Sequence, residues 1–150
     1  MFNLTIFKQN DQLIAILNFQ GNLDQSTYLE LIDKAKKLYD SGYRNLVFDM
    51  GSIPSLGLSG AFALYSAATL FNGDTPLDPR GGLRALHAMA DKVLSQPVRH
   101  FKLLRPQPAV KKALSQSGLP VYEDMESVLT SFGYGSGHSF RDQSRATRFH

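Results

Sequence analysis

The most constraining feature of the sequence is an apolar run at residues 61–71. It is long enough for a helix and has little polar surface, and such a helix must pack against other elements on most of its sides. Shortly before it, residues 45–50 form a brief apolar run that is typical of a strand in the middle of a covered sheet. Together the two runs predict helices packed against a sheet.

The other segments extend this pattern in both directions. The order of elements is strand, strand, helix, strand, helix, extra helix, strand, helix, strand, helix, and it predicts an α/β single domain. Its central sheet is expected to be mixed but mostly parallel, with right-handed crossovers. We expect the remaining strands at residues 4–8, 13–19, 98–104 and 121–122, and the remaining helices at 26–40, 83–94, 108–114 and 125–132.

The composition narrows the class of protein. A chain of 150 residues with 43% hydrophobic residues can form one domain with an ordinary core. It has no cysteine, which excludes disulfides, thiolate metal sites and cysteine nucleophiles. No apolar run reaches the roughly 18–20 residues of a membrane span, and the N-terminus lacks the pattern of a secretory signal. We therefore expect a cytoplasmic protein without a membrane span.

The positive charge of the chain is concentrated at its C-terminal end. Of the net charge of +3, residues 133–150 supply +2 and the preceding residues +1. A nucleic-acid-binding domain normally gathers cationic residues on its folded surface, so no nucleic-acid partner is expected. Residues 133–150 are rich in Gly, Ser, Arg and His, and they predict a flexible C-terminal tail after a domain at residues 1–132.

The segment before the apolar helix carries the main candidate residue. Residues 51–60 are rich in Gly, Ser and Pro and predict a loop, with Ser59 where the helix begins. The free N–H groups at a helix N-terminus favour a phosphate there, and Gly60 would leave the approach to the hydroxyl open. The alternative is that Ser59 only caps the helix. Ser52 and Ser55 are further candidate acceptors, although serines in turns need no such role.

Several motifs in order resemble the STAS domain, the fold of the bacterial anti-sigma factor antagonists. The resemblance covers roughly residues 4–132, apart from an insertion near 72–97. It depends on Gly21-Asn22-Leu23-Asp24 after the second strand, Gly42-Tyr43-Arg44-Asn45-Leu46-Val47-Phe48-Asp49 leading into the third, Ser59-Gly60 at the next helix, and Gly118-Leu119 with Val121-Tyr122 near the end.

The resemblance implies a function. In that family, the second serine of an Asp-Ser-Ser-Gly turn is phosphorylated by a partner kinase that is also an anti-sigma factor. The corresponding residues here are Gly57-Leu58-Ser59-Gly60, so the phosphoacceptor Ser59 is kept while Gly57 and Leu58 depart from the pattern. Asp24 matches an acidic position near the acceptor. The implied partner-binding residues are Asp24, Gly57, Leu58, Ser59 and Gly60, the partner is a serine kinase-like anti-sigma factor, and no cofactor is implied.

Other titratable residues give weaker signals. Asp24 could instead cap a helix or be a loop carboxylate, and Asp49 could stabilise the adjoining turn or act as a ligand or an acid–base group. No histidine has partners at metal-ligand spacing, so no metal site is expected. No Ser/His/Asp set has the spacing of a nucleophile elbow. The sequence therefore predicts a protein that is not an enzyme.

The helix within residues 72–97 is the most individual part of the chain. It could cover the core, form a surface for a homodimer or another partner, or serve as a lid hinged at Gly73 and Gly81-Gly82. The leading hypothesis is a regulatory protein-binding module that switches partners when Ser59 is phosphorylated. The alternatives are a STAS scaffold that is not phosphorylated, a small-ligand or lipid-pathway subunit, and an enzyme that uses Asp24, Asp49 and Ser59.

Overall fold

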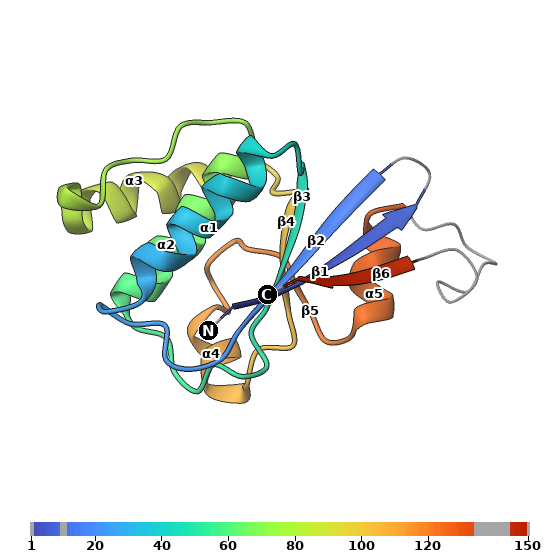
Figure 1. Ribbon diagram of the computed structural model, residues 1–150. Helices are drawn as coiled ribbons and strands as arrows, with labels where there is room; N and C mark the ends of the chain where they lie inside the picture. The colour runs from blue at the N-terminus through green and yellow to red at the C-terminus, as the bar shows by residue number, and fades with distance from the viewer. Residues whose placement is uncertain (1, 10–11, 134–144, 150) are drawn as a thin grey trace.

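The structure is a computed structural model that describes residues 2–9, 12–133 and 145–149. Its elements follow the predicted order of an α/β domain (Figure 1). The strands are β1 (Phe2–Gln9), β2 (Gln12–Phe19), β3 (Asn45–Asp49), β4 (Phe101–Leu104), β5 (Val121–Tyr122) and β6 (Arg145–Phe149). The helices are α1 (Tyr28–Asp40), α2 (Leu58–Phe71), the short η1 (Pro79–Gly81), α3 (Gly82–Ser95), α4 (Pro108–Ala113) and α5 (Met125–Ser131).

The strands form one mixed sheet in the order β5-β4-β3-β2-β1-β6. Strands β2 to β5 pair in parallel, whereas β1 pairs antiparallel with β2 and with β6. The connections from β2 through α1 to β3, and from β3 through α2 to β4, are therefore parallel crossovers, as the alternating pattern predicts. Because β2 and β3 are parallel neighbours, their C-terminal ends lie side by side, and the two candidate loops begin there.

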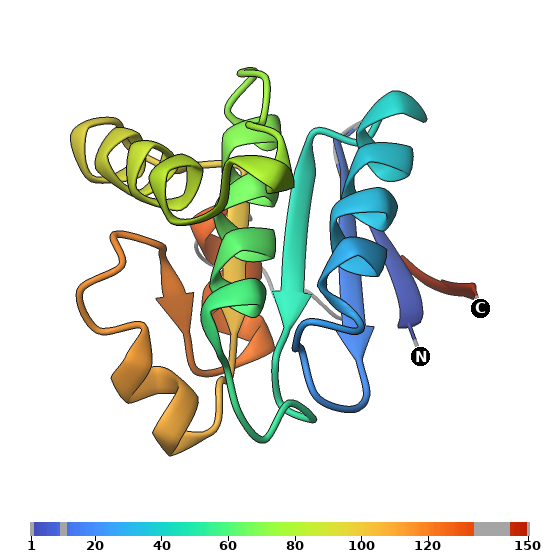
Figure 2. The same ribbon diagram turned by 90° about the vertical axis from the view of Figure 1, so that its left-hand side faces the viewer.

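Helices cover both faces of the sheet at β3, and this explains why every residue of that strand is buried. Leu46 and Phe48 pack in the main core with α1 and α2, whereas Val47, between them, packs with Val128 and Leu129 of α5. Figure 2 shows α1 and α2 lying across one face, and in Figure 1 α5 lies on the other side of the sheet. The continuous apolar run of β3 is thus the signature of a strand between two layers.

Helix α3 forms an additional layer outside α2. Ala85, Leu86 and Met89 of α3 pack against Phe62 of α2 in a separate apolar cluster. This contact buries a further side of α2, and nine of its 14 residues are buried in total. The predicted need of the apolar helix for neighbours on most sides is confirmed.

Two boundaries differ from the sequence expectation. Helix α2 begins at Leu58, three residues earlier than its apolar run, because Gly57 takes the N-cap position in an extended conformation. Helix α1 begins at Tyr28 with Thr27 as its N-cap, so the alternative in which Asp24 caps this helix is wrong. At the start of both helices, backbone geometry rather than the hydrophobic pattern decides the boundary.

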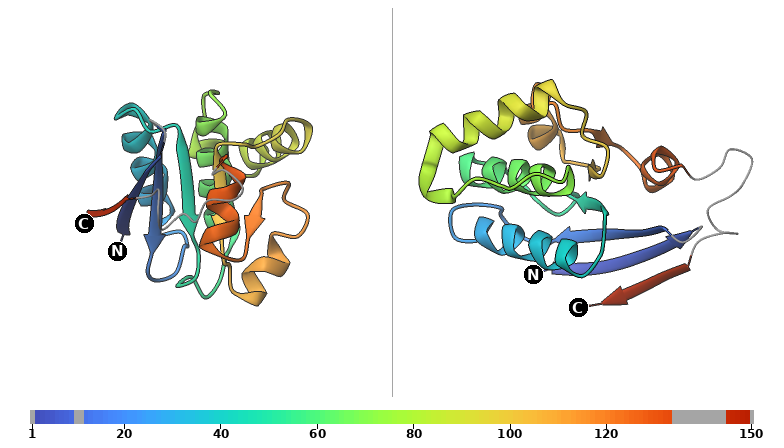
Figure 3. Two further views of the ribbon diagram at one scale, coloured as in Figure 1. Left: turned by 90° about the vertical axis from the view of Figure 1, so that its right-hand side faces the viewer. Right: turned by 90° about the horizontal axis from the view of Figure 1, so that it is seen from above.

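The end of the chain adds a strand that the sequence did not predict. β6 pairs antiparallel with β1 over Leu4 to Lys8, so five residues of the expected flexible tail lie at the sheet edge (Figure 3). The rest of that predicted tail, apart from Gly133, lies outside the described residues. None of the helices in the described part of the chain has the length and apolar character needed to cross a membrane.

Candidate functional site

Two loops meet at the edge of the sheet where β2 and β3 end. Leu23, in the loop after β2, forms a parallel bridge with Leu56, in the loop after β3. Nearby, the Gly21 N–H donates to the Ser52 carbonyl at 3.4 Å. Leu23 is fully buried by this contact. The loop that carries Asp24 and the loop that leads to Ser59 are therefore joined, as the resemblance implied.

Gly60 is essential to this junction for a steric reason. A Cβ atom at this position would lie 2.6 Å from Leu56 Cδ1 and 2.7 Å from the Leu23 carbonyl oxygen. The absence of a side chain lets the first turn of α2 approach the Asp24 loop closely. The structure thus gives Gly60 a packing role.

Ser59 occupies the second position of α2 and does not cap it. The N-cap is Gly57, and no side chain bonds to the free N–H groups of the first turn. The first N–H of the helix to find a backbone acceptor is that of Ala61, which donates to the Gly57 carbonyl at 2.9 Å. In the part of the chain that the structure describes, no hydrogen bond holds the Ser59 hydroxyl. The first turn also lacks an acidic residue, so its positive dipole end is not neutralised there.

Asp24 has a defined task in its own loop. Its Oδ1 accepts hydrogen bonds from the Ser26 N–H at 2.9 Å and from the Ser26 hydroxyl at 2.7 Å. These bonds favour the charged form and lower the pKa of the exposed Asp24 carboxyl. Its carbonyl oxygen accepts from the N–H groups of Thr27, the N-cap of α1, and of Tyr28, the first residue of that helix. Asp24 therefore organises the turn into α1 while its carboxylate stays at the surface.

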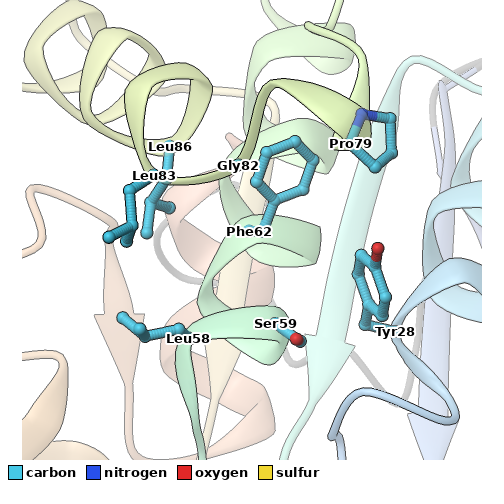
Figure 4. A pocket seen from close by; sticks show the side chains of 8 residues that line it. All are labelled: Tyr28, Leu58, Ser59, Phe62, Pro79, Gly82, Leu83 and Leu86. Carbon is cyan, nitrogen blue, oxygen red and sulfur yellow. The ribbon is translucent and has the colours of Figure 1, made fainter.

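The Ser59 side chain lines a small apolar cavity that the sequence did not reveal. The cavity has a volume of about 190 Å³ and lies between the start of α2 and the segment from η1 into α3. Figure 4 shows the Ser59 hydroxyl on the side of α2 that faces Tyr28. The lining residues are Tyr28, Leu58, Ser59, Phe62, Pro79, Gly82, Leu83 and Leu86. Apart from the two hydroxyl groups, the lining side chains are apolar.

Two exposed leucines flank this cavity. Leu58 is 64% exposed and Leu83 is 55% exposed, although both are large apolar side chains. Leu58 is the apolar departure from the family's turn, whereas Leu83 lies on the inserted helix, 25 positions further along the chain. We refer to Leu58, Ser59, Leu83 and the loop residues 21–24 as the Ser59 surface.

Asp49 belongs to a different part of the molecule. Its side chain is 8% exposed and forms an ion pair with Arg105, in which Nη2 lies 2.8 Å from Oδ2 and Nε lies 3.1 Å from Oδ1. Oδ1 also accepts from the Gly51 N–H at 3.0 Å, so the prediction that Asp49 stabilises the adjoining turn is confirmed. This carboxylate raises the pKa of Arg105.

Asp24 and Asp49 do not form a catalytic pair. Asp49 has the same orientation in β3 as Val47, and it lines a hollow on the α5 side of the sheet with Thr5 and Asn18. Asp24 lies at the start of α1, which packs on the opposite face. The alternative serines, Ser52 and Ser55, are exposed loop residues.

The histidines do not gather at a metal site. His100 Nδ1 lies 2.9 Å from Asn45 Oδ1, and His87 is exposed on α3. His138 and His150 lie outside the described residues. Within residues 2–9, 12–133 and 145–149, no three His, Asp or Glu side chains are placed to share a metal ion.

The comparisons with known proteins identify the fold. No protein-family model matches the sequence, and no curated protein matches it. The solved structure of an anti-sigma factor antagonist from Mycobacterium paratuberculosis matches at a TM-score of 0.52 and 18% identity, covering 87% of this chain and 93% of that one. The anti-sigma factor antagonist SpoIIAA in its unphosphorylated form matches at a TM-score of 0.48 and 16% identity, covering 87% of this chain and 94% of that one. The chain thus has the STAS-like fold of the anti-sigma factor antagonists.

Proposed function

We propose that this chain is a non-enzymatic regulatory module that binds a serine kinase-like anti-sigma factor through the Ser59 surface. The observation that carries the proposal is the Ser59 hydroxyl itself. It has no hydrogen-bond partner among the described residues and lies at an uncapped helix N-terminus beside the Asp24 loop. A solved structure with the same fold is that of an anti-sigma factor antagonist.

Phosphorylation of Ser59 would change this surface in a simple physical way. A phosphate adds about −1.5 to −2 charges and three acceptor oxygens. The free N–H groups at the start of α2 would stabilise it. The same charge would stand beside Leu58 and in the apolar cavity, where a partner would otherwise bury apolar side chains. We therefore expect phosphorylation to release a partner rather than to recruit one.

The experiment is to incubate the protein with candidate kinase-type anti-sigma factors and ATP and to map modification by mass spectrometry. We expect a phosphate on Ser59 that disappears in Ser59→Ala and persists in the control variants Ser52→Ala and Ser55→Ala. The phosphorylated protein should then bind the partner more weakly in a pull-down. The proposal would be contradicted if the protein were neither bound nor modified by any of the candidates.

A second candidate function is a scaffold that binds a partner without being phosphorylated. The apolar and exposed Leu58 favours it, because this residue and Gly57 replace the polar part of the family's turn. Stable binding without modification would identify this function. An enzyme that uses Asp49 would instead show turnover that is lost in Asp49→Asn, but its carboxylate is already engaged by Arg105 and Gly51.

A further inference from the structure

A second and larger cavity lies between α1 and α2, beneath the loop that leads to η1. Its volume is about 430 Å³, within the range of small-molecule sites. Ile32 and Ala35 of α1 and Ala67 and Leu70 of α2 line it, and Leu77 lies in the loop above. Ala35 and Ala67 are each 1% exposed, and their small side chains leave room that larger residues would fill.

Two charged side chains, Lys36 and Asp78, line this cavity, and Lys36 is free to form an ion pair with a ligand. Lys36 lies 3.1 Å from Asp40 in an ion pair whose two side chains are 67% and 61% exposed. Such an exposed pair contributes little to stability, so Lys36 can turn to another anion. Asp78, in contrast, accepts bonds from Arg80 Nε and Nη2 and from the Arg80 N–H, which lower its pKa to about 2. The cavity therefore suits an anionic group at Lys36.

A buried hydroxyl supplies a second polar contact. Ser66 lines the cavity and is 2% exposed. Among the described residues its hydrogen-bond partner is the Met89 thioether at 3.9 Å, which is a weak acceptor. Thr69, one turn further along α2, donates to the Tyr65 carbonyl at 2.7 Å, but Ser66 makes no such bond. A ligand oxygen would be a stronger acceptor for this buried hydroxyl than the thioether is.

We propose that this cavity binds a small, mainly apolar carboxylic acid that carries a second oxygen on its hydrocarbon body. The carboxylate would pair with Lys36 on α1, the hydrocarbon would lie between Ala35 and Ala67, and the second oxygen would bond to Ser66 on α2. The two polar groups stand on opposite walls of an apolar space, so the ligand needs two polar groups joined by an apolar segment. This site is independent of the proposed partner binding at Ser59.

Isothermal titration with ω-hydroxyoctanoate, octanoate and octanol tests the proposal on the whole chain. We expect saturable binding of one molecule per chain, strongest for ω-hydroxyoctanoate because it alone carries both groups. Lys36→Gln should weaken both acids about three-fold, as expected for an ion pair of a largely exposed side chain, and leave octanol unchanged. Lys37→Gln is the matched control, because Lys37 forms the equivalent pair with Asp33 at 2.9 Å but does not line the cavity.

Ser66→Ala separates ligand binding from a structural role. It should weaken ω-hydroxyoctanoate a few-fold relative to octanoate, while thermal stability stays equal or rises because a poorly paired buried hydroxyl is removed. The proposal is overturned if none of the three compounds binds with a dissociation constant below the millimolar range. It is also overturned if Lys36→Gln and Lys37→Gln weaken the acids equally.

Discussion

The end of β3 is bordered by two polar sites with opposite properties. On the α5 side of the sheet, Asp49 is buried and bonded to Arg105 and Gly51. On the side of α1 and α2, Ser59 is half-buried and has no hydrogen-bond partner within the described residues. A fully bonded group holds a fold in place, whereas a hydroxyl without a partner is available for chemistry or recognition. The contrast predicts a stabilising role for Asp49 and supports the binding role proposed for the Ser59 surface.

The largest expected effect is the loss of stability when the bonded site is removed. Asp49→Ala should lower the free energy of unfolding by about 2–3 kcal/mol, less than for a fully buried pair because Arg105 is 54% exposed. Ser59→Ala, which breaks no hydrogen bond, should change it by less than about 0.5 kcal/mol. Urea denaturation measures both values. Equal losses in the two variants would remove the distinction between the sites.

Gly60→Ala tests whether the Ser59 surface depends on a close backbone contact. Alanine normally favours a helix over glycine, but its Cβ would clash with Leu56 and the Leu23 carbonyl. We expect a net loss of about 1–2 kcal/mol of stability, measured by the same denaturation. In the control Gly57→Ala, a Cβ meets nothing within 4 Å, and φ is −101°, so stability should remain unchanged. A Gly60→Ala protein as stable as the original would show that the loops can separate freely.

Leu58→Ala and Leu83→Ala sharpen the comparison from the functional side. Both side chains are more than half exposed, so each variant should keep its stability within about 0.5 kcal/mol. If partner binding buries them beside Ser59, affinity should fall about tenfold in each, as measured by surface plasmon resonance with the anti-sigma factor. Leu94→Ala is the control, since Leu94 is 62% exposed on α3 but does not line the Ser59 cavity. A loss of affinity only in the control would place the interface elsewhere.

The smallest expected effect concerns the pH response of the Asp24 loop. The bonds from Ser26 lower the pKa of Asp24 below 3.8, so their contribution is present at neutral pH and is lost as pH falls through the folded-state pKa. Ser26→Ala should raise this pKa toward 3.8, as followed by NMR titration of the carboxyl. Because Asp24 is exposed, global stability at neutral pH should hardly change. An unchanged pKa would mean that the bond from the Ser26 hydroxyl does not persist in solution.

Local patterns were sufficient to predict most of the fold. The apolar run of β3, the glycine-rich loop and the apolar α2 follow one another within 30 residues, and each has a distinct composition. The start of α2 was misplaced because Gly57, Ser59 and Gly60 surround its first turn, and such residues are typical of a loop. β6 was missed because its five residues depend on the free edge of β1, more than 130 positions earlier.

The candidate site was predictable only in part. Ser59 could be selected because the loop pattern placed it where a helix begins, and Asp24 because it matches an acidic position in the resembled family. The cavity beside Ser59 could not be predicted, because it arises where Tyr28, Phe62 and Leu83 meet through the packing of three helices. Likewise, Arg105 as the partner of Asp49 depends on neighbouring strands that are 56 residues apart in sequence.

The close contact at Gly60 has a consequence for how related sequences should be compared. Because the Leu23 carbonyl excludes any side chain at this position, a glycine here records the packing of two loops, whether or not a kinase acts on the chain. A Ser-Gly pair is therefore poor evidence of phosphorylation among proteins of this fold. Positions 57 and 58 have no such steric restriction, and their residues are the better guide to which relatives have kept a switch and which retain only a binding surface.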